Sequence, residues 1–444
     1  MKTTDTTNVS SRIVYRGYVL FILVVVYTFN FIDRQIVGIL ATPIKEDLGL
    51  NDTQLSLMGG LAFALFYTVL GIPIAMLADR KSRTWIMTIA LAVWSGMTAL
   101  CGLAQNFGQL FAARLGVGVG EAGGVAPAYS LITDYFPPAQ RARALSIYSF
   151  GVPIGSALGI LLGGVLTSYL DWRAAFVIVG VLGLAIAPVF RLTVREPKRG
   201  GFDGAKAETQ PTNIKDVVST LTSKPSFWGL AFGAASSSMM GYGLIFWLPS
   251  FFIRSFGDAL PGFFAWLPAW TTPGEPGVLL YASYFYATIL LFGGIAGIWL
   301  GGVLADRYGP DRKAAYALTP AFAFLATMPF FIVGVLSTNL WVAFVTFTAL
   351  TALSLVWVGP VITAFQHLVQ PNMRATASAV FLFINNLIGI GLGNLAIGAI
   401  SDGLAAQMGD ESLRYAILCG TVFYVIAAGL FFVTAPRIKK DWVG

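Results

Sequence analysis

Four charged side chains stand inside stretches of sequence that are long and apolar enough to cross a lipid bilayer. Asp33 and Arg34 are neighbours in the first such stretch, and Arg114 and Glu121 lie in the fourth. A charge at the centre of a bilayer costs about 3 kcal/mol even on insertion scales, so such residues usually face an aqueous cavity and mark the path of a substrate or ion. Two acids and two arginines therefore form the predicted functional centre.

The spacing of these charges allows ion pairs between the two stretches. The first stretch runs outward and the fourth inward, so that, at about 1.5 Å per residue, Arg114 lies near the depth of Arg34 and Glu121 about two turns deeper. We expect Asp33 to meet Arg114, and the long side chain of Arg34 to reach toward Glu121.

These pairs predict a way to couple a proton to a conformational change. Arginine stays charged, so Asp33 and Glu121 are the deep groups that could carry the proton. A carboxylate that exchanges its arginine partner between two conformations links protonation to their equilibrium. We expect Glu121, as the more buried acid, to be the carrier, with Asp33 coupled to it. The alternative is a structural ion network that holds the two stretches together.

The composition identifies a polytopic membrane protein. Of 444 residues, 56% are hydrophobic and 11% are charged, against about 25% charged in soluble proteins. The net charge of +7 falls mainly in short loops, which excludes nucleic acid as a partner. The single histidine and the two cysteines, Cys101 and Cys419, lack the spacing of metal ligands. We expect free thiols, no metal, no cofactor, and no enzymatic activity, since no nucleophile–base pair is evident.

Apolar runs of about 20 residues, bounded by turn residues and charges, predict an all-α protein with twelve transmembrane helices. Their approximate limits are 14–41, 54–79, 83–104, 107–134, 140–169, 172–191, 224–255, 278–305, 313–336, 339–368, 374–401 and 414–435.

Most of the 28 Lys and Arg residues fall on one side of these spans. The positive-inside rule then places both termini in the cytoplasm.

The two halves of the chain repeat. An Ala-Asp-Arg loop follows span two at Asp79 and returns after span eight at Asp306. This repetition predicts two pseudo-symmetric six-helix bundles, 1–191 and 224–444, that rock about a central site. The basic stretch 192–223 between them is expected to be a cytoplasmic linker with a short surface helix.

Two local features have simpler interpretations. The Gly-x-Gly-x-Gly run before Glu121 follows no strand, so it is better explained by close helix packing than by nucleotide binding. The stretch 259–276, with Phe263, Phe264, Trp266 and Trp270, is expected to anchor the chain at the outer membrane interface. A flap beside a lipid entrance is the alternative.

Several motifs resemble those of known transporters. The duplicated Ala-Asp-Arg loops are similar to the signature of the major facilitator superfamily, although the first copy has Ala75 and Ser82 where glycines are usual. The runs Asn30–Arg34 and Arg114–Ala122, with 134–156, resemble the spinster family of lysolipid and sphingolipid transporters. The second half matches mainly by topology.

The resemblance implies cytoplasmic latches between helix ends. Asp79 would meet the start of span eleven, and Asp306 the start of span five. Loops that only set topology are the alternative. The latch residues are Asp79, Arg80, Arg83, Asp306, Arg307, Arg141 and Arg143.

The second half offers no deep charge, but polar, aromatic and sulfur-containing side chains that could line a cavity. The best polar candidates are Asn385 and Asn386, because an amide pair in mid-span needs partners. The other candidates are Met240, Tyr242, Phe246 and Trp357.

A charged pole in one half and an apolar wall in the other suit an amphiphile. Together with the resemblance, they predict a proton-coupled transporter of a lysophospholipid or sphingoid lipid, with Arg34 or Arg114 at the head group. The alternatives are a proton symporter of small organic anions, a multidrug–proton antiporter and, last, a membrane sensor or scaffold. We expect a monomer, surrounded by membrane lipids, in a bacterial inner membrane.

Overall fold

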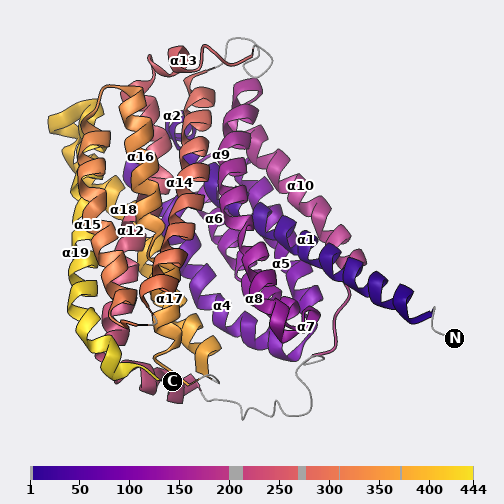
Figure 1. The fold of residues 1–444 in the computed structure, drawn as a ribbon. Helices are drawn as coiled ribbons and strands as arrows, with labels where there is room; N and C mark the ends of the chain where they lie inside the picture. The colour runs from indigo at the N-terminus through magenta and orange to yellow at the C-terminus, as the bar shows by residue number, and fades with distance from the viewer. Residues whose placement is uncertain (1–3, 200–213, 269–276, 310, 371–372, 444) are drawn as a thin grey trace. The chain divides into compact units, whose positions relative to one another are not determined.

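The structure is a computed structural model that describes residues 4–199, 214–268, 277–309, 311–370 and 373–443. These residues form helices joined by short loops (Figure 1). By contact, the chain divides into two compact units. Unit 1 comprises Met1–Gln35, Phe66–Gly159 and Arg173–Glu208, and unit 2 comprises Ile36–Leu65, Ile160–Trp172 and Thr209–Gly444.

Within residues 4–199, the structure describes ten α-helices and one π-helical turn. They are α1 (Thr4–Ile39), α2 (Ala41–Leu48), α3 (Asp52–Ser56), the π-helical turn η1 (Leu57–Leu61), α4 (Ala62–Arg80), α5 (Arg83–Cys101), α6 (Phe107–Glu121), α7 (Val125–Tyr135), α8 (Pro138–Ser149), α9 (Gly151–Tyr169) and α10 (Trp172–Thr193).

The second half begins with the short helix predicted in the linker and continues with long helices. They are α11 (Ile214–Thr222), α12 (Pro225–Phe256), α13 (Leu260–Phe263), α14 (Val278–Tyr308), α15 (Ala315–Leu336), α16 (Leu340–Leu355), α17 (Val358–Gln366), α18 (Arg374–Met408), the 3-10 turn η4 (Gly409–Glu411) and α19 (Ser412–Asp441).

Within the described residues, ten stretches are long and apolar enough to span a membrane, and one of them, Val380–Asp441, covers both α18 and α19. The predicted fourth span is not one continuous helix. It is divided into α6 and α7 at Ala122–Gly124, where two consecutive glycines lower the helix propensity of the turn. Glu121 is therefore the last residue of α6, not a mid-helix residue.

In unit 1, the glycine run of α6 packs closely against α5, which is the close helix packing expected of these small residues. A Cβ at Gly116 would lie 2.1 Å from the Met97 side chain, and one at Gly120 would lie 2.5 Å from the backbone nitrogen of Trp94. Only glycine allows this approach, so the run brings α5 close to the carboxylate that ends α6.

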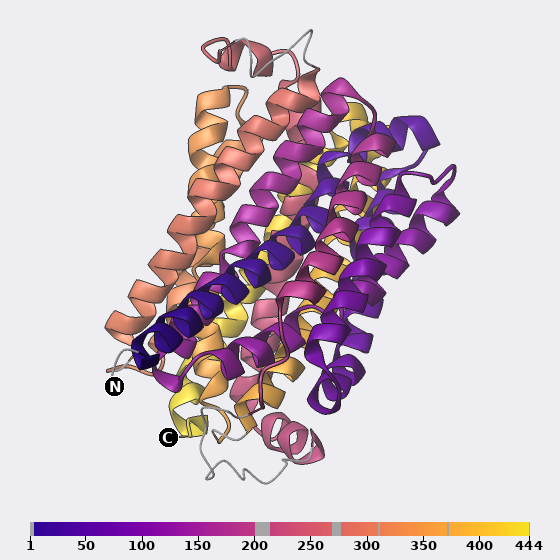
Figure 2. The same ribbon diagram turned by 90° about the vertical axis from the view of Figure 1, so that its right-hand side faces the viewer.

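In unit 2, α12 lies beside α18 and α19 (Figures 1 and 2). Glycines again set the spacing, because a Cβ at Gly393 would lie 2.2 Å from the Met239 carbonyl oxygen and one at Gly233 would lie 2.8 Å from the Phe431 ring. The segment α3–η1 also packs on α18. This packing is why 36–65 groups with the second half, so the contact units differ from a division at the linker.

The predicted aromatic anchor is described only up to residue 268, and Trp270 lies outside the described part. Phe263 packs on Trp341, with ring centroids 4.5 Å apart, and Phe264 is buried. Trp266 is exposed. Of these three, only Trp266 presents its ring outward, so the two phenylalanines hold α13 against the rest of unit 2 while the tryptophan suits a membrane interface.

Candidate functional site

The centre of unit 1 holds an ion pair between Arg34 and Glu121. Nε of Arg34 donates a hydrogen bond of 2.7 Å to Oε2 of Glu121, as the sequence suggested. The Glu121 side chain is 0% exposed and that of Arg34 is 12% exposed. Glu121 also ends α6, where the helix dipole disfavours an anion, so the carboxylate depends on the guanidinium for compensation.

Aromatic rings fix the position of the Arg34 guanidinium. Its central carbon lies 4.6 Å from the centroid of Tyr67 and 5.0 Å from that of Phe31. A cation over an aromatic face gains about 0.5–2 kcal/mol, more when desolvated. Arg34 is thus held by one charge and two rings, yet keeps part of its surface accessible.

Asp33 and Arg114 form a second, more buried group beside this pair. Each is 1% exposed, and Nη1 of Arg114 lies 3.5 Å from the backbone oxygen of Asp33. The Asp33 carboxylate interacts electrostatically with Glu121 and Arg114 and faces the side chain of Thr98 on α5. Its Oδ1 has no hydrogen-bond partner within the described part of the chain.

The spacing of polar residues along α1 directs them toward different helices. Asn30 and Asp33 lie one turn apart on α1, and both are buried. Asn30 faces the Glu121 carboxylate, while Asp33 faces α5. Neighbouring residues on a helix point about 100° apart, so Asp33 and Arg34 serve different partners from adjacent positions.

The predicted polar wall of the second half is a hydrogen-bonded amide group. Asn385 is buried and accepts a hydrogen bond of 2.8 Å from the Ser238 hydroxyl, while its Nδ2 donates to Oδ1 of Asn386 at 3.4 Å. These contacts satisfy the need for partners that made the pair conspicuous in the sequence.

The other predicted wall residues differ in exposure. Met240 is buried, and its sulfur would lie 2.7 Å from a Cβ at Gly420, while Phe246 is buried with its ring over Gly59. Tyr242 and Trp357 are partly exposed. Met240 and Phe246 thus serve helix packing in this structure.

The loop after α4 leads into a buried cluster around Arg83. Its side chain pairs with Asp134 on α7 and donates a hydrogen bond of 2.7 Å to Glu196. Glu196 also accepts from the backbone N–H of Thr84 at 2.9 Å and the hydroxyl of Ser82 at 3.0 Å. Arg83 thus ties α5 and α7 to the segment that leaves α10.

For the other predicted latch residues, less is described. Arg80 and Arg307 are exposed. The side chains of the remaining four, Asp79, Asp306, Arg141 and Arg143, lie outside the described part of the structure. Contacts from these four to helix ends therefore stay predictions.

Sequence analysis did not single out Thr98, Asp134 or Glu196 as site residues. Thr98 and Asp134 carry weak signals, because polar residues at the edge or interior of an apolar run often have partners. Glu196 stands in a charged segment and has no local signal. Its role depends on the fold that returns α10 beside α5.

The comparisons agree with this architecture. Residues 23–394 match the family model described as Major Facilitator Superfamily. An MFS-type efflux pump of Mycolicibacterium smegmatis is 33% identical over 95% of this chain and 92% of its own length, and protein spinster homolog 1 of Xenopus tropicalis is 29% identical over 96% and 82%.

A solved structure is also similar. It is a bacterial homolog of the human lysosomal transporter Spinster, in an inward-facing and unoccupied conformation, with a TM-score of 0.85, 33% identity, and coverage of 97% of this chain and 99% of the other.

Long apolar helices with charges buried among them, together with these matches, define a secondary transporter that works by alternating access. The chain belongs to the major facilitator superfamily and, within it, to the spinster family.

Proposed function

We propose that this protein couples proton movement to the transport of an amphiphilic lipid of the lysophospholipid or sphingoid type. The observation that carries the proposal is the Arg34–Glu121 pair, 2.7 Å long and buried inside unit 1. An ionisable pair within a membrane domain marks the path of a substrate or proton.

Arg34 is the proposed contact for an anionic head group. It keeps 12% of its side-chain surface accessible, whereas Arg114 is 1% exposed. A head group that pairs with Arg34 would weaken the hold of the guanidinium on Glu121. Glu121 would then bind a proton more readily, because an unpaired anion is costly in a medium of low dielectric constant. Substrate and proton would thus be linked through one arginine.

The alternative functions differ from this proposal in the transported substrate. A small organic anion would use the same arginine. A proton-linked efflux activity is a second candidate, favoured by the name of the mycobacterial relative, an MFS-type efflux pump. An arginine beside the acid makes a cationic guest less suitable than an anionic or zwitterionic one.

The test is transport of a lysophospholipid into proteoliposomes at several pH values. Wild type is compared with Glu121→Gln and with Glu46→Gln, the same substitution at an exposed carboxylate. We expect saturable transport whose pH dependence is lost in Glu121→Gln and kept in Glu46→Gln.

Other outcomes separate the parts of the proposal. Transport with unchanged pH dependence in Glu121→Gln would keep the substrate and move the proton to Asp33 or elsewhere. Uptake of a small carboxylate without lysolipid transport would contradict the lipid assignment.

A further inference from the structure

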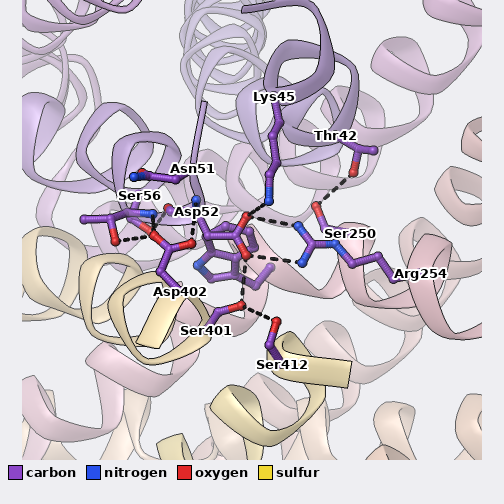
Figure 3. A network of polar contacts seen from close by, with 12 residues as sticks. Thr42, Lys45, Asn51, Asp52, Ser56, Ser250, Arg254, Ser401, Asp402 and Ser412 are labelled. Atoms are coloured by element: carbon purple, nitrogen blue, oxygen red, sulfur yellow. Dashed lines mark hydrogen bonds and ion pairs between the residues drawn. The ribbon is translucent and has the colours of Figure 1, made fainter. Parts of the chain in front are cut away.

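A buried carboxylate at the start of α3 is the centre of a second polar network, which lies in unit 2 (Figure 3). Asp52 is 2% exposed. Its Oδ1 accepts from Nζ of Lys45 at 2.6 Å and from Nη2 of Arg254 at 3.0 Å. Its Oδ2 accepts from Nη1 of Arg254 at 3.2 Å and from the hydroxyl of Ser401 at 2.9 Å. Four donor atoms from three other helical segments thus meet on one acid.

A second carboxylate, on α18, binds the start of α3 (Figure 3). Oδ1 of Asp402, on α18, accepts from the backbone N–H of Asp52 at 3.1 Å. Its Oδ2 accepts from the backbone N–H and the hydroxyl of Thr53, at 2.8 and 2.5 Å. An acid of α3 therefore binds α12, and an acid of α18 binds the free N–H groups that begin α3, where the helix dipole favours an anion.

The network lies at one defined end of unit 2. At the start of α12, Nζ of Lys224 donates to the backbone oxygen of Asp441 at 2.7 Å, so this end adjoins the linker and the end of α19. Arg254 is in the last turn of the same helix, at the opposite end. Since the linker is predicted to be cytoplasmic, the network belongs to the outer end.

The surfaces joined by the network fit without spare room. A Cβ at Gly398 would lie 2.1 Å from the Ser56 hydroxyl oxygen and 2.7 Å from the Asp52 carbonyl oxygen. A Cβ at Gly60 would lie 2.7 Å from the carbonyl oxygen of Ile390. One surface comes from the first half of the chain and the other from the second.

We propose that Asp52, Asp402 and Arg254 form an outer latch that holds the first half of the chain against the second and must release before the outer side opens. Alternating access requires such surfaces to part. Buried ion pairs are suited to reversible closure, because water repays much of the lost attraction when the charges separate. The inference depends only on alternating access, not on the lipid or proton assigned above.

The test measures a distance across the latch in the full-length protein. Spin labels are placed at the exposed positions Glu46 on α2 and Asp258 beyond α12, in a background of Cys101→Ala and Cys419→Ala. Double electron–electron resonance in lipid nanodiscs without substrate then gives the ratio of long to short distances. We expect wild type to favour the short distance, and Arg254→Gln and Asp402→Asn each to raise the ratio at least tenfold.

The matched control breaks an ion pair inside one half. Glu411 pairs with Arg414 at 3.0 Å, three residues away, so Glu411→Gln should leave the ratio unchanged. If Arg254→Gln fails to fold, Ser401→Ala and Thr53→Val each remove one hydroxyl donor and should shift the ratio in the same direction by a smaller factor. Unchanged distances in folded latch variants, or an equal shift in Glu411→Gln, would overturn the inference.

Discussion

The Arg34–Glu121 pair makes a quantitative prediction through three variants: Arg34→Gln, Glu121→Gln and the double substitution. Arg34→Gln leaves a carboxylate that is 0% exposed without its cation. Breaking a buried pair in this way costs about 3–5 kcal/mol of stability. Glu121→Gln leaves a cation that is 12% exposed and still lies over two aromatic rings, so we expect a smaller cost of about 1–3 kcal/mol.

The double variant has no charge left to compensate, and two amides can share a hydrogen bond. Replacing both members of a buried pair is often close to neutral, so we expect a cost of about 1 kcal/mol or less. The double variant should therefore be more stable than Arg34→Gln alone, with a coupling energy of at least about 3 kcal/mol between the two positions.

Equilibrium unfolding in mixed detergent micelles at one pH measures the three free energies of unfolding. If the cost of the double variant equals the sum of the single costs within about 0.5 kcal/mol, the two residues act independently. That result would refute the pair as an energetic unit and would leave the proton proposal without its structural basis.

Three further predictions concern other parts of the chain. Thr98→Val should alter the pH dependence of transport, because the residue faces a deep acid, whereas Thr327→Val, equally buried but bonded within its own helix, should not. Gly120→Ala should lower the unfolding midpoint through a clash worth about 1–3 kcal/mol, whereas Gly71→Ala, with nothing within 4 Å, should be neutral or stabilising. Partial burial would raise the pKa of Glu196, but a backbone N–H and a guanidinium lower it below its ordinary value. Glu196→Gln should therefore destabilise the protein at pH 7. The difference should disappear as the pH falls from about 4.3, the unfolded pKa, through the lower folded pKa. Thermal unfolding at pH 7 and at a pH below the folded pKa would measure it.

The deep charges could be predicted because a membrane makes them exceptional. Burial of Asp33 or Glu121 in lipid without a partner is costly, so their presence in apolar spans indicates a functional site. The antiparallel direction of spans one and four then predicts the Arg34–Glu121 pair. The same reasoning placed Asn385 among the polar candidates. In each case a polar or charged residue stands within an apolar span, where such residues are rare.

The residues of the proposed outer latch could not be predicted, because charges at their positions are not exceptional. Lys45, Asp52, Arg254 and Asp402 stand at span ends, where charged residues are ordinary. Nothing local distinguishes a solvated charge from one that binds another helix. Their meeting depends on the packing of α3 on α18, which brings together residues about 350 positions apart.

Helix α1 makes close contacts in both units. Within unit 1, α9 packs closely against α1, because a Cβ at Gly155 would lie 2.4 Å from the carbonyl oxygen of Thr28. Within unit 2, a Cβ at Gly38 would lie 3.3 Å from the backbone of Phe246. Because protein interiors are closely packed, contacts this near mean that a shift of α1 would require its neighbours to repack. The proposed latch would supply contacts that can part during alternating access, because water solvates both partners of an ion pair when they separate.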